Sequence, residues 1–277
     1  MWVDDYQRDG YYFPVQVLSA AEAQGYRCAL EENEAFCRAH PEHASLKTYP
    51  HMLLPWLDEL MRQAAILDHV SAILGPDLMV WNTSFFTKEA ASPSYVSWHQ
   101  DLHYWGLDAD DEVTAWVALS PATSASGCMR FVAGSHAVDN APHRDTFSNN
   151  NLLSRGQELA VEVDESNAVD VVLQPGQMSL HHGKTYHASH PNRSDDRRIG
   201  VAIRYIKPSM AQANNTKTFA ALVHGEDRFG HFQHAPAPAS LFAPADRERA
   251  LQARLQADKI LYADASQAGL RTLAPGA

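Results

Sequence analysis

Residues 169–206 read VDVVLQPGQMSLHHGKTYHASHPNRSDDRRIGVAIRYI. This stretch contains three short runs rich in β-branched and apolar residues, at 169–173, 178–182 and 199–206, with Pro, Gly, Asn and Ser between them. Such runs, bounded by turn-forming residues, are typical of β-strands. Four more runs of the same kind precede them, at 79–87, 95–101, 113–120 and 129–132. Many short strands separated by turns predict a β-sandwich or jelly roll rather than alternating βαβ units.

The segments on both sides of this β-rich region have the periodicity of helices. In the N-terminal part, about residues 1–75, Ser19 and Glu22 have the spacing of a capping box, and apolar residues recur at helical intervals over 55–74. Helical spacing returns at 245–262. We therefore expect a single domain, residues 1–277, that is mainly β with flanking helices. Its expected parts are the helical N-terminal region, a β core at about 78–206, and a C-terminal loop and helix at 207–277.

Composition and charge argue against several classes of protein. The 277 residues are 45% hydrophobic and 20% charged, as in a folded globular protein. The chain has 22 Lys and Arg against 33 Asp and Glu, a net charge of −11, so we expect no nucleic-acid or membrane partner. Its first residues are acidic where a signal peptide would be basic, which predicts a cytoplasmic protein. Three cysteines without a CxxC pair predict neither a disulfide framework nor a zinc site.

A short motif, Trp98-His99-Gln100-Asp101, provides the first candidate for metal chemistry. In the expected strand at 95–101, side chains two residues apart lie on the same face, so His99 and Asp101 could bind one ion together. A further histidine would complete the 2-His-1-carboxylate set that serves non-heme Fe(II) oxygen chemistry. The simpler alternative is a hydrogen-bonded pair of side chains. The histidines of the next cluster that could supply the third ligand are His181, His182, His187 and His190.

The expected strand at 199–206 presents two arginines on one of its faces. The residues on that face are Arg198, Gly200, Ala202 and Arg204. The residues between them are apolar and should face the packed core. Two guanidinium groups separated by two very small side chains leave room for a ligand along the strand, and one of them could hold a carboxylate in a bidentate fork. The alternative is a surface strand whose arginines pair with Asp195 and Asp196.

Three segments together resemble one known family. They are HQD at 99–101, SGCMRFVAGSH at 126–136 and PGQMSLHHGKTYHASHPNRSDDRR at 175–198. In this order they resemble the phytanoyl-CoA dioxygenase family of Fe(II)/2-oxoglutarate oxygenases, and the similarity spans about residues 78–206. The resemblance implies a double-stranded β-helix, a jelly roll of the cupin type, between N-terminal and C-terminal helices.

The resemblance also implies the roles of individual residues. The implied ligands of Fe(II) are His99, Asp101 and His187. Arg198 would hold the C5 carboxylate of 2-oxoglutarate, because it follows the distal histidine by eleven residues as in the family. Ser189 would be a second contact to that carboxylate, and Lys88 resembles a family lysine near the co-substrate. O2 is the further co-substrate.

The function that the resemblance implies is hydroxylation of an unactivated C–H bond, with release of succinate and CO2. The substrate would be small, aliphatic and polar or zwitterionic, such as an amino acid, an osmolyte or an aminoalkylphosphonate, free or tethered to a carrier. The strings HQDLHYWGL at 99–107 and RRIGVAIRY at 197–205 resemble more closely a branch that includes aliphatic halogenases. In those enzymes Ala or Gly stands at the carboxylate position, so Asp101 argues against halogenation.

Other outcomes remain open on the residues alone. They are desaturation, cyclisation or halogenation in a natural-product pathway, or a jelly-roll binding protein without turnover. The long polar insertion at 140–164 is expected to form a rim of the active site. Candidates for the substrate pocket are Asn82, Ser84, His103, Tyr104, Trp116, Arg130 and Arg204.

Overall fold

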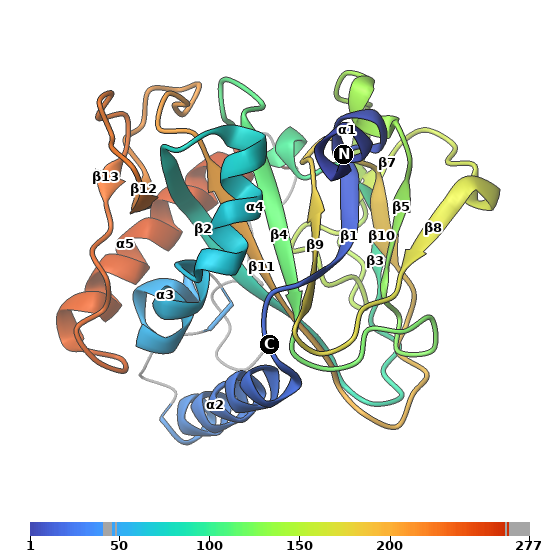
Figure 1. Cartoon of the computed structure of the whole chain (residues 1–277), viewed down its shortest axis with the longest axis horizontal. Coiled ribbons are helices and arrows are strands. Elements are labelled where there is room, and N and C mark those ends of the chain that lie inside the picture. The colour runs from blue at the N-terminus through green and yellow to red at the C-terminus, as the bar shows by residue number, and fades with distance from the viewer. Residues whose placement is uncertain (41–45, 48, 264, 266–277) are drawn as a thin grey trace.

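The computed structural model describes residues 1–40, 46–47, 49–263 and 265. In this part of the chain, two sheets form the body of the molecule and helices cover one side of the larger sheet (Figure 1). Neighbouring strands are antiparallel except for one short parallel pair, β12 with β13. This arrangement confirms the expected mainly β, jelly-roll class with flanking helices.

The major sheet has the strand order β1-β9-β4-β11-β2-β12-β13, and the minor sheet has the order β3-β10-β5-β8. The strands of the major sheet are β1 Tyr11–Gln16, β2 Leu78–Lys88, β4 Glu112–Ala118, β9 Gln177–His181, β11 Arg198–Ile206, β12 Phe219–His224 and β13 Gln233–His234. Those of the minor sheet are β3 Val96–His99, β5 Met129–Val132, β8 Ala168–Val171 and β10 His187–Ser189. A separate hairpin consists of β6 His143–Asp145 and β7 Gln157–Leu159.

The helices flank this β core. The α-helices are α1 Trp2–Asp9, α2 Ala20–Ala39, α3 Pro55–Met61, α4 Ala64–Leu74 and α5 Pro244–Leu261, and the short 3-10 helices are η1 Pro50–Met52, η2 Leu102–Tyr104, η3 Ser135–Ala137 and η4 Glu165–Asn167. The predicted capping box is present, since Ser19 Oγ accepts from the amide of Glu22 and the Glu22 carboxylate accepts from the amide of Ser19. None of the described helices is both long and apolar enough to cross a membrane.

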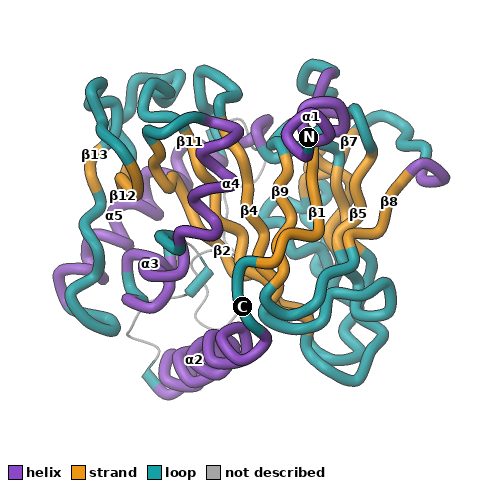
Figure 2. Tube along the Cα trace, viewed as in Figure 1, coloured by secondary structure: helices purple, strands orange, loops and turns teal. Residues whose placement is uncertain are grey.

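Two expectations for the N-terminal region are wrong. Residues 11–16 do not continue a helical region but form β1, which pairs with β9 at the edge of the major sheet. The run at 55–74 forms two helices, because the chain leaves helical geometry at Gln63. Arg62, at the end of α3, donates to the carbonyl of Leu222 in β12. Figure 2 shows α3 and α4 as two separate helical segments.

The two faces of the major sheet bury different kinds of residue. On the helix-covered face, the apolar residues of β11 pack with those of α3 and α4 in one large core. The opposite face turns toward the minor sheet, where Trp116 and Ala202 pack in the same cluster as Phe131 of β5. The predicted alternation of β11 is therefore correct, with the small residues and arginines directed between the sheets.

The space beside Gly200 does not hold a ligand, contrary to our expectation. A Cβ at this position would overlap the indole carbons of Trp116, so the aromatic ring already fills the volume that glycine leaves. Arg198 and Arg204 consequently lie on opposite sides of the Trp116 ring.

The insertion at 140–164 packs along β3. Its segments β6 and β7 pair with each other, and Asn151 donates to Ser97 Oγ at 2.7 Å. His143 Nε2 accepts from the amide of Gln100 at 3.1 Å. The described residues of this insertion therefore buttress the strand that precedes Asp101, and none of them lines the cavity described next.

Candidate metal centre

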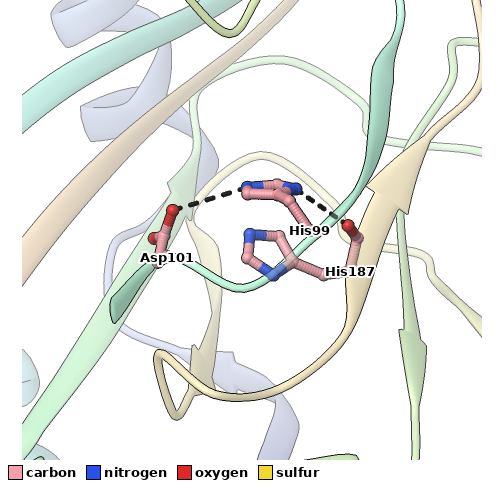
Figure 3. A group of neighbouring side chains, drawn as sticks. All are labelled: His99, Asp101 and His187. Atoms are coloured by element: carbon pink, nitrogen blue, oxygen red, sulfur yellow. Dashed lines mark hydrogen bonds and ion pairs between the residues drawn. The ribbon is translucent and has the colours of Figure 1, made fainter. Parts of the chain in front are cut away.

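Two histidines from different strands lie side by side between the sheets. β10 runs antiparallel to β3, and His187 stands directly opposite His99. Their ring centroids are 3.9 Å apart (Figure 3). Both side chains are buried.

Asp101 reaches the same place by a route that the sequence did not predict. β3 ends at His99, and Asp101 has helical dihedral angles (φ −66°, ψ −49°) at the start of η2. The i, i+2 argument for one strand face is therefore wrong, although the two side chains do meet: Asp101 Oδ1 lies 3.4 Å from His99 Nε2. One possible ligand atom of each of His99, Asp101 and His187 lies within 4.8 Å of the others.

Backbone carbonyls orient both imidazoles. His99 Nδ1 lies 2.9 Å from the carbonyl of Ser97 and 3.0 Å from that of His187, and His187 Nδ1 lies 2.9 Å from the carbonyl of Thr185. A carbonyl only accepts, so Nδ1 of each ring must donate. This tautomer leaves Nε2 of both rings free to bind a cation. At many metal sites the ligating histidine likewise donates its other ring N–H to a backbone carbonyl.

The electrostatics of the triad also suit a cation. Burial alone would raise the pKa of Asp101, but Arg204 and the two histidines hold that pKa well below its usual value. Burial lowers the pKa of His187 well below that of free histidine. The site therefore offers one carboxylate and neutral imidazole, the protonation states in which these side chains bind metals.

Arg198 provides a second test of the expected chemistry. The side chain is 1% exposed, lines the cavity of the triad, and its guanidinium carbon lies 5.4 Å from the centroid of Trp116. Its Nε and Nη2 have no hydrogen-bond partner among the described residues. Burial lowers the pKa of this guanidinium to about 10. A buried cation with unused donors fits the distal carboxylate of 2-oxoglutarate.

Lys88 and Ser189 form the floor beside Arg198. Lys88 is directly opposite Arg198 in the pairing of β2 with β11. Its ammonium donates to Ser189 Oγ at 2.6 Å, to the carbonyl of Gly127 at 3.2 Å and to the carbonyl of His190. Burial, together with Arg198, lowers the pKa of Lys88 to about 6. Ser189 lines the cavity and Lys88 lies behind it.

The expected substrate residues divide into two groups. Trp116 and Arg204 line the cavity. Asn82 is directly opposite Arg204 in the pairing of β2 with β11, and Ser84 accepts from Arg204 Nη1 at 3.1 Å. Arg204 Nε in turn lies 3.7 Å from Asp101 Oδ2.

The structure places the other three away from the cavity. His103 is exposed on η2 and stacks on His143. β3 ends at His99, so strand alternation does not direct His103 into the cavity. Tyr104 lies next to Arg155, 5.3 Å from ring centroid to guanidinium carbon. Arg130 alternates to the outer face of β5, where its guanidinium lies 2.6 Å from Glu165.

Sequence reasoning missed two polar residues that line the cavity, Thr114 and His181. His181 was considered only as a possible ligand, and it lies outside the ligand triad with its ring centroid 4.9 Å from that of His187. Burial lowers its pKa to about 4. The alternation of β4 could have identified Thr114, because it is two residues from Trp116 on the same face.

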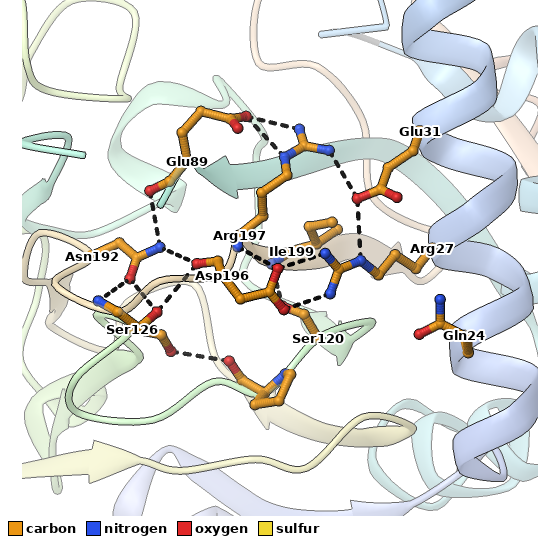
Figure 4. A network of polar contacts seen from close by, with 12 residues as sticks. Gln24, Arg27, Glu31, Glu89, Ser120, Ser126, Asn192, Asp196, Arg197 and Ile199 are labelled. Atoms are coloured by element: carbon orange, nitrogen blue, oxygen red, sulfur yellow. Dashed lines mark hydrogen bonds and ion pairs between the residues drawn. The ribbon is translucent and has the colours of Figure 1, made fainter. Parts of the chain in front are cut away.

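A surface network holds the start of β11 against α2 (Figure 4). Arg27 of α2 donates to both carboxylate oxygens of Asp196, and Arg197 reaches Glu31 and Glu89. The alternative in which Arg198 pairs with the neighbouring aspartates is therefore wrong: Asp196 is bound by Arg27, and Arg198 points the other way into the cavity.

Comparisons with known proteins identify the family of the chain. The family description "Phytanoyl-CoA dioxygenase (PhyH)" matches residues 6–200. The chain belongs to the phytanoyl-CoA dioxygenase family. It is 29% identical over 161 residues to a probable alpha-ketoglutarate-dependent hypophosphite dioxygenase of Stutzerimonas stutzeri, covering 56% of this chain and 54% of that protein. The chain thus spans about half the length of the curated relatives it matches.

Solved structures cover more of the chain. The apo form of the non-heme monooxygenase ThoJ superposes with a TM-score of 0.83 at 36% identity, covering 95% of this chain and 98% of that one. CytC3 with Fe(II) and alpha-ketoglutarate superposes with a TM-score of 0.64 at 22% identity, covering 87% and 95%, and shows the shared fold. The expected family, fold and cofactors, Fe(II) and 2-oxoglutarate with O2 as co-substrate, are confirmed at the level of the family.

Proposed function

We propose that this chain hydroxylates an unactivated C–H bond of a small, polar or zwitterionic aliphatic substrate, with conversion of 2-oxoglutarate to succinate and CO2. The observation that carries the proposal is the complete triad of His99, Asp101 and His187 beside Arg198, whose Nε and Nη2 have no hydrogen-bond partner among the described residues. The substrate would be a free small molecule or one tethered to a carrier.

The residues of the chain divide the work between them. His99, Asp101 and His187 would hold Fe(II), which would supply the oxidising chemistry with O2 while 2-oxoglutarate is oxidised to succinate and CO2. His99 and His187 present Nε2, because their Nδ1 atoms are committed to backbone carbonyls. Arg198 orients the keto acid by its distal carboxylate. Trp116 lies over Gly200, between the two arginines along β11.

Asp101 supports hydroxylation over halogenation. A halide can bind only where the protein carboxylate ligand is missing. Here Asp101 provides a carboxylate oxygen at that position. Desaturation and cyclisation use the same ligand set, and the solved neighbours include enzymes described as an epimerase and a carbocyclase. The products therefore decide between these outcomes.

The experiment is a screen of small aliphatic acids, amino acids and phosphonates with the iron-loaded enzyme, scored by succinate release. Each positive reaction is repeated under 18O2 and analysed by mass spectrometry, with Asp101→Ala as the matched inactive control. A product heavier by one 18O atom supports hydroxylation. A product that has lost two hydrogens, or that carries chlorine in chloride buffer, would replace hydroxylation by desaturation, cyclisation or halogenation.

A further inference from the structure

The cavity holds a second polar feature, apart from the residues proposed to bind iron and 2-oxoglutarate. Four adjacent strands of the major sheet place one residue each in a single cross-strand row: His181 pairs with Thr114, Thr114 with Arg204, and Arg204 with Asn82. Directly opposed residues project to the same side of a sheet. The first three of them line the cavity together with the metal ligands.

Each member of this row has polar atoms without a hydrogen-bond partner among the described residues. They are both ring nitrogens of His181, Oγ1 of Thr114, Nε of Arg204 and Oδ1 of Asn82. His181, Thr114 and Arg204 are 2%, 1% and 6% exposed, so they are removed from solvent. Leaving a buried donor or acceptor unsatisfied costs about 1–3 kcal/mol. A row of such groups facing one cavity is expected where a ligand completes the hydrogen bonds.

The charges in the cavity define the kind of ligand. Two arginines, Arg198 and Arg204, and one carboxylate, Asp101, line it. Fe(II) and doubly charged 2-oxoglutarate add charges that cancel, so the loaded site keeps one excess positive charge. Burial raises the pKa of the nearby Glu112 carboxyl well above its usual value and so disfavours its charged form. An uncompensated buried charge is costly.

The excess charge lies at the Arg204 end of the cavity. Arg198 meets the distal carboxylate of 2-oxoglutarate at the other side of Trp116. Arg204 is 3.7 Å from Asp101, whose charge is shared with the metal in the loaded site. Its Nη1 donates to Ser84 Oγ, and its Nε, the atom that faces Asp101, has no hydrogen-bond partner among the described residues.

We propose that the primary substrate carries a singly charged oxyanion, a carboxylate or a phosphorus oxyanion, which accepts hydrogen bonds from Arg204 and Thr114 and contacts His181. This inference rests on the proposed function and narrows its substrate class. The row would fix the charged end of the substrate beside Asp101, so that the C–H bonds within a few ångströms of that end are presented to the metal.

The test is a titration of the anaerobic enzyme loaded with Fe(II) and 2-oxoglutarate, followed by its visible charge-transfer band. The probes are butyrate and methylphosphonate, with butyramide and butylammonium as neutral and cationic controls. We expect a saturable shift of the band with at least one oxyanion and none with the two controls. Arg204→Gln should raise the half-saturating concentration more than about 10-fold, and Arg204→Lys should restore part of the loss.

Thr114→Val is the second variant, because it keeps the shape of the side chain and leaves Arg204, the residue next to Asp101, unchanged. It should raise the half-saturating concentration of the oxyanion about 3–10-fold, the effect of one hydrogen bond. Arg130→Gln, on the outer face of β5, is the matched control and should change nothing.

The outcomes separate the two proposals. A folded enzyme that forms no band with Fe(II) and 2-oxoglutarate contradicts the proposed function itself. A normal band that no oxyanion shifts, or that butyramide or butylammonium shifts equally, overturns the oxyanion site and leaves the oxygenase intact. The oxyanion site is also overturned if Arg204→Gln and Thr114→Val bind the oxyanion as tightly as the wild type does.

Discussion

Lys88 and Arg198 lie directly opposite each other on β2 and β11, yet among the described residues protein acceptors satisfy only one of these two buried basic side chains. The ammonium of Lys88 has three oxygen acceptors, whereas Nε and Nη2 of Arg198 have none among the described residues. Lys88 therefore belongs to the frame that shapes the pocket, and Arg198 is the cation available for a bound carboxylate.

This difference predicts the phenotype of Arg198→Ala. The variant should bind Fe(II) as the wild type does and need about 10–100 times more 2-oxoglutarate, because one charge-assisted interaction is worth about 1.5–3 kcal/mol. Isothermal titration of iron and co-substrate under anaerobic conditions measures both. Arg130→Ala serves as the control. If Arg198→Ala retained normal affinity for 2-oxoglutarate, Arg204 would be the better candidate for the carboxylate anchor.

Gly200→Ala should damage the cavity through packing alone. The new methyl group would overlap Trp116, and overpacking of this kind costs about 1–3 kcal/mol. We expect a lower midpoint of urea unfolding and a change in tryptophan fluorescence. Gly25→Ala is the matched control. Gly25 lies within α2, and a Cβ added there would meet open space, so this substitution should raise stability by about 0.5–1 kcal/mol. Equal effects of the two substitutions would argue against this packing.

Acid should destabilise the metal-free protein through its buried histidines. Burial, assisted by Arg62, lowers the pKa of His51 to about 3. Below about pH 6.5 His51 binds a proton in the unfolded chain but stays neutral in the folded protein. The free energy of unfolding therefore falls as the pH decreases toward 3. Each such histidine contributes up to about 1.4 kcal/mol per pH unit. In chelator-treated protein, His51→Leu should reduce this slope by about one proton between pH 6 and 5; an unchanged slope would refute the assignment.

Asp101→Ala should weaken the binding of Fe(II) more than about 100-fold, because loss of a residue that only supports a ligand already costs 10–100-fold. Succinate release should disappear with it. Equilibrium dialysis with ferrous iron measures the affinity, and near-ultraviolet circular dichroism checks that the variant is folded. Full retention of iron would remove Asp101 from the ligand set.

The sequence predicts the strands of the core well because their patterns are local. β11 keeps strict alternation from Arg198 to Ile206, and burial of its apolar face follows from that pattern alone. β1 escaped prediction because it contains Pro14, lies at the edge of the sheet and does not alternate in burial, so it lacks the pattern of a core strand. β10, with three residues, is shorter still, and its pairing with β3 depends on the tertiary fold.

The metal ligands illustrate where local reasoning stops. The motif at 99–101 contains the right residues, but the chain bends between His99 and Asp101, so the strand geometry assumed for them does not exist. The same bend turns His103 outward. From the residues alone, four histidines remained candidates for the third ligand, and only the register between β3 and β10 distinguishes His187 from the others.

Anaerobic titration of the metal-free protein with Fe(II) in the presence of 2-oxoglutarate tests the central claim most directly. The account predicts one iron per chain and a visible charge-transfer band in the wild type, and loss of both in a folded His187→Ala variant. An iron stoichiometry and band in His187→Ala equal to those of the wild type would contradict the account.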